Sequence, residues 1–328
     1  MNLTTTVWQR LSTRRQVPPA IGPVILTQNR VYILPTSGGL IFGATLVVML
    51  LGCVNYNLGL GYVLTFLLAG VAVVALLHTF RNLAHLRVLP GRAQPVFAGD
   101  TAVFPVLLDN PSRQARYAVA VSVADDLIAR GLEATHAAWV DIAPGQQATA
   151  LLRLHAAHRG RLALPRLRVA SVFPLGLFRA WAYVHLDAHC IVYPRPEGGE
   201  VPLPPPRSGK DDGLQSAHGT DDFAGLRNYH AGDSLRHIAW KAVARNQPLM
   251  TKQFDGLSTG QVRLSWNDTP AHLRPEARIA RMARWVVDAS RAGVPFAMEL
   301  PGAGFASARG AAHEARCLTA LALLRIRG

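Results

Sequence analysis

The sequence predicts a membrane-anchored α+β protein with an N-terminal two-helix transmembrane hairpin, a β-sandwich-like domain and a short α/β domain. Three observations predict this class. Residues 31–80 contain no Asp, Glu, Lys or Arg. Residues 83–196 alternate short apolar segments with turn residues, and beyond residue 214 strand patterns alternate with helix patterns. The expected parts are a basic segment (1–30), the hairpin (31–82), the sandwich-like domain (83–196), a Pro/Gly-rich linker (197–214) and the α/β part (215–328).

The composition excludes several classes of protein. Of 328 residues, 50% are hydrophobic and only 16% are charged, whereas about 25% are charged in typical soluble proteins. A disordered chain is therefore excluded. The three cysteines, Cys53, Cys190 and Cys317, are far apart, which argues against a disulfide framework and against a Cys-x-x-Cys zinc site.

Two apolar runs predict the hairpin. They are Gly38–Val54 and Leu58–Phe80, separated only by Asn55-Tyr56-Asn57. At 1.5 Å per residue the helices would be about 26 Å and about 34 Å long, which brackets the hydrocarbon thickness of a bilayer. The alternative is a buried helix pair in a soluble fold, for which fifty residues without a charge are unusual.

Arginines on both sides of the hairpin predict its orientation. Arg10, Arg14, Arg15 and Arg30 precede it, Arg81, Arg87 and Arg92 follow it, and no acidic residue occurs before Asp100. Positively charged flanks favour the cytoplasmic side, so both termini are expected inside and the Asn-Tyr-Asn turn outside. The acid-free N-terminus could also be a transit peptide, but the two apolar runs that follow argue against this reading.

Five short segments predict the strands of the sandwich-like domain: Thr101–Leu108, Tyr117–Val123, Ala148–Leu154, Leu162–Val169 and His189–Tyr193. The linker after them contains too much Pro and Gly to be expected to pack. In the last part the patterns predict helices at Asp233–Arg245, Pro275–Ala292 and Ala311–Arg325, and strands at Val262–Trp266 and Val294–Leu300.

The segment Phe223–Asp255 combines basic, acidic and aromatic residues in a regular pattern. On its predicted helix, His237, Lys241 and Arg245 recur every four residues and form one polar stripe. Arg236 and Trp240 are also four apart, which allows a cation–π contact. The segment could be a basic surface for a partner, or an ion-pair network with its neighbouring aspartates that holds a loop to the helix. The candidate residues are Arg227, Tyr229, Asp233, Arg236, Trp240, Lys241 and Arg245.

These residues resemble a known family. Leu226-Arg227-Asn228-Tyr229, Gly232-Asp233, Arg236-His237-Ile238-Ala239-Trp240-Lys241 and Ala244-Arg245 are similar to the hallmark of the family called domain of unknown function 58. The segments Phe173–Arg179 and Val192–Pro196, and the hairpin itself, also resemble that family.

The resemblance implies a bacterial inner-membrane protein with a β-domain and a von Willebrand factor A-like domain. It further implies a non-enzymatic adaptor that acts with a MoxR-type AAA+ ATPase, in some lineages beside a membrane transglutaminase-like protein. One feature departs from the pattern: A domains bind a metal through Asp-x-Ser-x-Ser after their first strand, whereas this chain has Ser265-Trp266-Asn267-Asp268-Thr269-Pro270. Neither register gives that ligand set, so no metal and no cofactor are expected, and the domain would be a short version of the fold.

Nucleic-acid binding and catalysis are the alternatives to an adaptor role. The net charge of +14 suggests nucleic-acid or anionic-polymer binding, but no helix-turn-helix, zinc-finger or RNA-binding motif occurs, and basic flanks are expected beside anionic lipid. An enzyme is not expected, because the sequence contains no G-x-x-x-x-G-K-[ST] and no G-x-S-x-G motif. His155, His158, His230 and His237 lack a nucleophile in a recognisable motif and are expected to have structural roles.

Overall fold

The computed structural model describes residues 22–124, 137–199, 201–205 and 262–325, and the backbone of 223–228 and 250–254. The chain divides into two compact units, residues 1–195 with 322–325 and residues 196–321 with 326–328. Each unit is described by itself.

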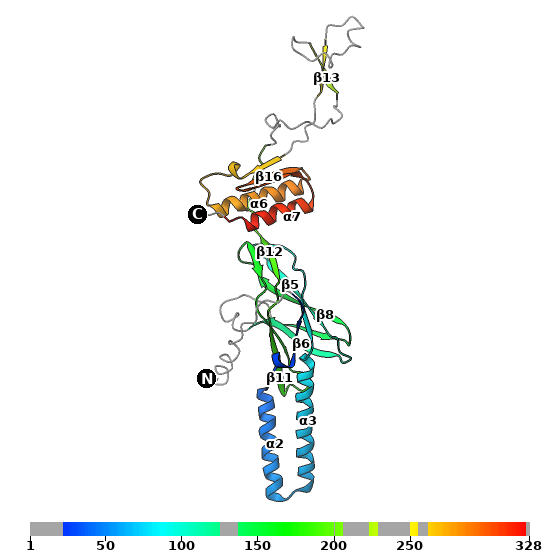
Figure 1. The fold of residues 1–328 in the computed structure, drawn as a ribbon. Coiled ribbons are helices and arrows are strands. Elements are labelled where there is room, and N and C mark those ends of the chain that lie inside the picture. Colours follow the sequence, from blue (N-terminus) through cyan, green and yellow to red (C-terminus); the bar gives the residue numbers. More distant parts are fainter. Residues whose placement is uncertain are drawn as a thin grey trace. The chain divides into compact units, whose positions relative to one another are not determined.

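The hairpin of the first unit consists of α2 (Ser37–Tyr56) and α3 (Gly59–Leu83), which lie side by side (Figure 1). The turn between them is two residues long. Asn57 adopts a left-handed conformation (φ 50°), and its N–H donates to the carbonyl of Cys53, which ends α2. The two predicted apolar helices are confirmed: α2 extends slightly beyond its predicted run at both ends, and α3 begins one residue later and ends three residues later than predicted.

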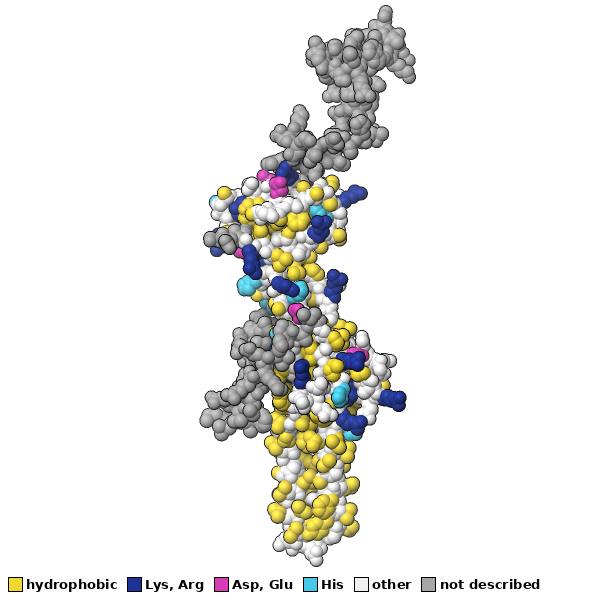
Figure 2. All heavy atoms as spheres, viewed as in Figure 1, with side chains coloured by type: hydrophobic (Ala, Val, Ile, Leu, Met, Phe, Trp, Pro, Cys, Tyr) yellow, Lys and Arg dark blue, Asp and Glu magenta, His cyan; other side chains and the backbone are white. Residues whose placement is uncertain are grey.

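Both helices expose apolar side chains all around. Leu60 is 88% exposed, Ile41 69% and Val48 68%, and Figure 2 shows hydrophobic and uncharged surface over the part of the hairpin that lies away from the strands. By length and composition each helix could cross a membrane, since 20 and 25 residues give about 30 Å and about 37 Å. A soluble core helix would instead bury most of such residues.

The rest of the first unit is a set of short strands in three sheets. The strands are β1 (Val24–Ile25), β2 (Tyr32–Pro35), β3 (Arg87–Pro90), β4 (Val96–Phe97), β5 (Thr101–Asp109), β6 (Arg116–Val123), β7 (Ala138–Ile142), β8 (Gln147–His155), β9 (Gly160–Ala163), β10 (Leu167–Ser171), β11 (Phe178–Val184) and β12 (His189–Tyr193), with a 3-10 turn at Gln28–Arg30. Their orders are β1-β3-β5-β8, β2-β11-β10-β6-β7 and β4-β12-β9.

One apolar core joins these sheets. Its fully buried side chains include Phe104 and Leu108 from β5, Val121 from β6, Val169 from β10 and Val192 from β12. Along β5 every second residue is buried, as expected of a strand with one face on a core. All neighbours within the two larger sheets pair antiparallel. The unit is therefore a mixed α+β assembly in which the end of α3 reaches the core through Leu83, while most of the two helices lies outside it.

One predicted strand is wrong. Residues Leu162–Val169 form parts of two strands, β9 and β10, which belong to different sheets. Pro165 lies between them, and proline has no N–H to donate to a sheet. Apolar residues alternate on each side of the break, at Leu162 and Leu164 and again at Leu167 and Val169, but the register shifts by one residue between the two halves. The regular pattern within each half suggested a single strand.

The second unit contains β15 (Val262–Ser265), a 3-10 turn (Trp266–Asp268), α6 (Pro275–Arg291), β16 (Phe296–Leu300), β17 (Ala303–Ala308) and all but the last two residues of α7 (Ala311–Leu323). The strands β15 and β16 run parallel with α6 between them in the chain, and β17 pairs antiparallel with β16. The apolar side of α6 is buried, with Ile279, Met282 and Val286 fully covered. The two helices predicted here are confirmed to within a few residues.

The first part of the predicted linker packs, contrary to expectation. Glu197 accepts two hydrogen bonds from Arg281 on α6, and its N–H donates to the carbonyl of Ala280. The carbonyl of Pro202 accepts from the indole N–H of Trp285 at 3.0 Å. The carbonyl groups of a proline-rich segment can accept hydrogen bonds from the side chains of a helix. The composition of the segment does not predict such contacts.

Two further strands, β13 (Phe223–Asn228) and β14 (Met250–Phe254), pair antiparallel. The helix predicted at Asp233–Arg245 lies outside the described residues.

Candidate functional site

The residues that sequence reasoning proposed as a site are mostly outside the described part of the chain. Arg227 lies in β13, where the backbone alone is described. The other six, Tyr229, Asp233, Arg236, Trp240, Lys241 and Arg245, lie outside the described residues.

The feature that the structure places in detail is the attachment of the hairpin to the β-strands of its own unit. We call it the hairpin junction: Thr36 before α2, Thr79 and Asn82 on α3, Tyr117 on β6, and the loop 172–177 between β10 and β11. The end of α3 lies against β6, β10 and β11 (Figure 1).

Asn82 connects α3 to two strands. Its amide nitrogen donates to the carbonyl of Tyr117 and to Ser171 Oγ, both at 2.7 Å, and its amide oxygen accepts from the Tyr117 N–H at 3.1 Å. The Asn82 side chain is 4% exposed. The asparagine amide carries a donor and an acceptor on one planar group. It can therefore form with the backbone of Tyr117 the two hydrogen bonds that a neighbouring strand would form.

Thr79 lies one helical turn before Asn82 and contacts the loop 172–177. Its hydroxyl lies 2.7 Å from the carbonyl oxygen of Phe173 and 2.8 Å from that of Ala75, and it can donate a hydrogen bond to either. The ring of Phe173 packs against that of Tyr117 with centroids 5.0 Å apart. Helix, loop and strand therefore share one set of contacts at the end of α3.

The same loop holds the start of α2. Thr36 donates from its hydroxyl to the carbonyl of Gly176 at 2.6 Å and from its N–H to the carbonyl of Leu177 at 2.9 Å. The Thr36 hydroxyl also accepts from the N–H of Gly39, which caps the helix. At Gly39 a Cβ would lie 2.0 Å from the Leu177 carbonyl oxygen, so only glycine allows this approach.

The junction contains hydroxyl, amide and aromatic groups but no ionised side chain among these contacts. Its hydrogen bonds satisfy polar groups at the start of α2 and at the end of α3. Such contacts indicate a structural role rather than a catalytic one. One loop thus contacts the start of α2 and the end of α3.

At the end of β15, where the A-domain resemblance would place a metal, the structure has an arginine. The guanidinium of Arg278 lies 4.2 Å from the centre of the Trp266 ring and donates to Thr269 Oγ1 at 2.6 Å and to the Trp266 carbonyl at 2.8 Å. This positive charge would repel a divalent cation. Over the described ranges, no group of three His, Cys, Asp or Glu side chains could hold a metal ion.

The three cysteines are buried. Burial raises the pKa of the Cys317 thiol to about 11, and burial also raises the pKa of Cys190. Since the thiolate is the reactive form, these two groups are poor nucleophiles at neutral pH.

Sequence reasoning missed the hairpin junction. The signal that could have found it is a pair of polar residues, Thr79 and Asn82, one turn apart at the end of an apolar helix. In a chain with such a helix, polar groups at this position need protein partners. The segment Phe173–Arg179 was singled out only for its family resemblance, and its part up to Leu177 proves to contact both helices.

A comparison with protein-family models gives no match for this chain, and a comparison with curated proteins gives none either.

Proposed function

We propose that this chain is a membrane-anchored, non-enzymatic adaptor of the bacterial inner membrane. It would act with a MoxR-type AAA+ ATPase in the assembly or maturation of client proteins, in some settings beside a membrane transglutaminase-like protein. Both termini would be cytoplasmic and the turn at Asn57 outside.

The observation that carries the anchoring part is the hairpin with its junction. Along the two helices many apolar side chains are more than half exposed, and their transfer from water into lipid lowers the free energy. Polar groups within the helices bond inside the chain, as a bilayer requires: Thr45 donates to Ile41 and Thr65 to Gly61. The arginines on both flanks support the proposed orientation.

The adaptor part rests on the family resemblance in Leu226–Arg245. The finer fold assignment belongs to the same proposal: the three-sheet unit would be β-sandwich-like, and β15–α6–β16 would be the start of a short A-like domain. A parallel strand pair joined by an amphipathic helix is compatible with this assignment. The buried, high-pKa thiol of Cys317 supports a role without nucleophilic chemistry.

The deciding experiment is capture of a co-encoded AAA+ ATPase by the full chain in detergent. We expect association that Arg236→Ala and Lys241→Ala each weaken, while Arg30→Ala, outside the hallmark segment, leaves it unchanged. No association, or association untouched by both variants, would contradict the adaptor proposal.

The net charge of +14 supports a second candidate, a membrane-tethered nucleic-acid or anionic-polymer binder. It predicts DNA binding by the detergent-solubilised chain that weakens steeply as salt increases. Absence of binding at low salt would remove this candidate.

A further inference from the structure

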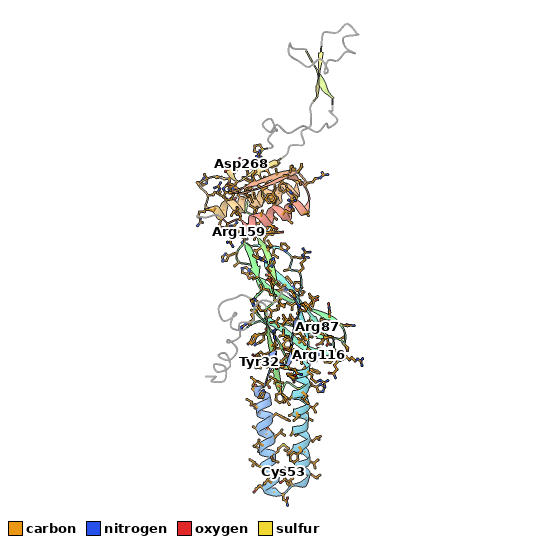
Figure 3. The ribbon with its side chains drawn as sticks, viewed as in Figure 1. Tyr32, Cys53, Arg87, Arg116, Arg159 and Asp268 are labelled. Carbon is orange, nitrogen blue, oxygen red and sulfur yellow. The ribbon has the colours of Figure 1, made fainter. Side chains whose placement is uncertain are left out.

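A pocket of about 460 Å³ lies where α3 meets the turn between β5 and β6. The end of α3 and the residues after it contribute Arg81 and His85, the turn contributes Ser112, Arg113 and Gln114, and the start of β6 contributes Arg116. Figure 3 labels Arg116 at the end of the strands next to α3. Residues more than thirty positions apart in the sequence thus form one concave surface.

The pocket is lined by three arginines and by no acidic residue. Asp109, the acidic residue that precedes the turn, forms an ion pair with Arg87 instead, at 3.7 Å. Within the described ranges neither Arg81 nor Arg113 has a carboxylate at ion-pair distance. The pocket therefore concentrates positive charge that no carboxylate in the described part of the chain neutralises at ion-pair distance.

Arg116 is the most unusual member, because its guanidinium is buried. The residue is 6% exposed, and its side chain donates to Asn110 Oδ1 at 3.3 Å and to the Ala84 carbonyl at 3.2 Å. Both acceptors are uncharged. Burial lowers the pKa of Arg116, and the charge of Arg81 lowers it further. A buried cation with only neutral partners is costly, and an anion beside it would offset that cost.

The backbone fixes this arrangement. Asn110 is fully buried, and its amide nitrogen donates to the carbonyls of Gln114 and Ala143 at 2.8 and 3.2 Å. His85 adopts a left-handed conformation (φ 64°), and its N–H donates to the carbonyl of Leu26 at 2.8 Å. The turn after α3 and the turn before β6 are therefore both held, and the pocket is formed without a ligand.

The location of the pocket points to the source of the anion. Arg81 is the first charged residue after the long apolar stretch of α3. In the proposed membrane setting, the pocket would therefore lie level with the lipid headgroups of the cytoplasmic leaflet.

We propose that this pocket is a phosphate-binding site in which Arg81, Arg113 and Arg116 hold the headgroup phosphate of an anionic phospholipid. Arginine suits this ligand because its planar group donates two parallel hydrogen bonds to phosphate oxygens. The choice of a lipid rests on the proposed membrane anchoring, whereas the choice of phosphate rests on the pocket alone.

The test uses the full chain in a neutral detergent, followed by native mass spectrometry. The chain is titrated with phosphatidylglycerol, with phosphatidylcholine, and with glycerol 3-phosphate as a soluble phosphate compound. We expect one tightly bound phosphatidylglycerol per chain, weakened about tenfold or more in the Arg81→Gln/Arg113→Gln variant by loss of two charge-assisted contacts. Arg116 is not substituted, because it also bonds the end of α3.

The matched control is Arg30→Gln/Arg92→Gln, which removes two exposed charges that flank the hairpin outside the pocket. Unchanged affinity in this control supports the site, whereas equal loss in both double variants means general charge attraction and overturns it. If glycerol 3-phosphate binds tightly and displaces the lipid, the pocket is still a phosphate-binding site, but its ligand is a soluble compound and the lipid assignment is overturned. Binding of neither ligand above the level of phosphatidylcholine also overturns the proposal.

A separate measurement distinguishes failure of the pocket from failure of the anchor. Flotation of the full chain with vesicles of phosphatidylcholine alone reports insertion of the hairpin, and it does not depend on the arginines. If the chain floats with the vesicles but shows no preference for phosphatidylglycerol, the anchoring proposal stands and the proposal of a phosphate-binding pocket is overturned.

Discussion

Asn82 on α3 and Tyr117 on β6 exchange hydrogen bonds in both directions, side-chain amide to backbone carbonyl at 2.7 Å and backbone N–H to side-chain oxygen at 3.1 Å. A neighbouring β-strand would form the same pair of hydrogen bonds with the backbone of Tyr117. Here the side chain of one helical residue forms them. It connects the last turn of the hairpin directly to the sheet β2-β11-β10-β6-β7.

We expect Asn82→Ala to destabilise the first unit. The change leaves the carbonyl and N–H of Tyr117 and the hydroxyl of Ser171 without this partner, at a cost of about 2 kcal/mol or more. Thermal unfolding of the full chain in detergent measures the loss. Asn29→Ala, at an exposed position, is the control, and equal melting temperatures of the two variants would contradict the role of Asn82.

Gly39→Ala should separate α2 from the loop 172–177. The added methyl would lie 2.0 Å from the carbonyl oxygen of Leu177, so the helix or the loop must move, at about 1–3 kcal/mol. Gly43→Ala is the matched control on the same helix, because a Cβ there meets nothing within 4 Å. Proteolysis rates at the loop would show the difference, and similar rates in both variants would argue against close contact.

The two helices should also approach closely near their turn. A Cβ on Gly61 would lie 2.4 Å from Cys53 Sγ, whereas one on Gly70 meets nothing within 4 Å. Gly61→Ala should therefore change the helix spacing and Gly70→Ala should not. Distances between spin labels on α2 and α3, measured in vesicles, test this prediction. It fails if Gly61→Ala leaves the spacing as in the parent chain.

The ion pair between Glu197 and Arg281 should make stability depend on pH. The hydrogen bond from Arg281 holds the pKa of Glu197 below its ordinary value of 4.5. A lowered folded-state pKa means that the contribution is present above the unfolded pKa and is lost as the pH falls through the folded one. Because both side chains are partly exposed, the effect is small, below about 1 kcal/mol.

The measurement compares Glu197→Gln with the parent chain by thermal unfolding between about pH 6 and pH 3. The parent should be the more stable at the upper end, and the difference should shrink toward the lower end. A difference that stays constant with pH would show that the charge of Glu197 contributes nothing.

The cysteines should resist thiol reagents while the protein is folded. All three are buried, and burial raises the pKa of Cys317 to about 11. We expect slow maleimide labelling at neutral pH and complete labelling after denaturation. Rapid labelling of Cys317 in the folded chain would contradict its burial.

Local patterns in the sequence predicted much of the fold. The helices α2, α3, α6 and α7 each have a continuous apolar run or a regular apolar face, and their predicted bounds are close to the observed ones. Strands β5 and β12 were predicted equally well, because alternation along a strand reports burial of one face.

Long-range contacts could not be predicted. Nothing in the sequence pairs Arg81 with Arg116, because the sheet topology alone brings the end of α3 beside the β5–β6 turn. The same holds for Thr36 and the loop 172–177, about 140 residues apart. The division of Leu162–Val169 between two sheets depends on a proline whose effect on pairing is visible only when the neighbouring strands are known.

The loop 172–177 contacts α2 through Thr36 and α3 through Thr79. A domain attached to its anchor at one point can turn in any direction, whereas one attached at two points can turn only about the line between them. In the proposed membrane setting, a force on these strands would therefore tilt the helix pair within the bilayer. The bilayer would then resist the force that a partner applies.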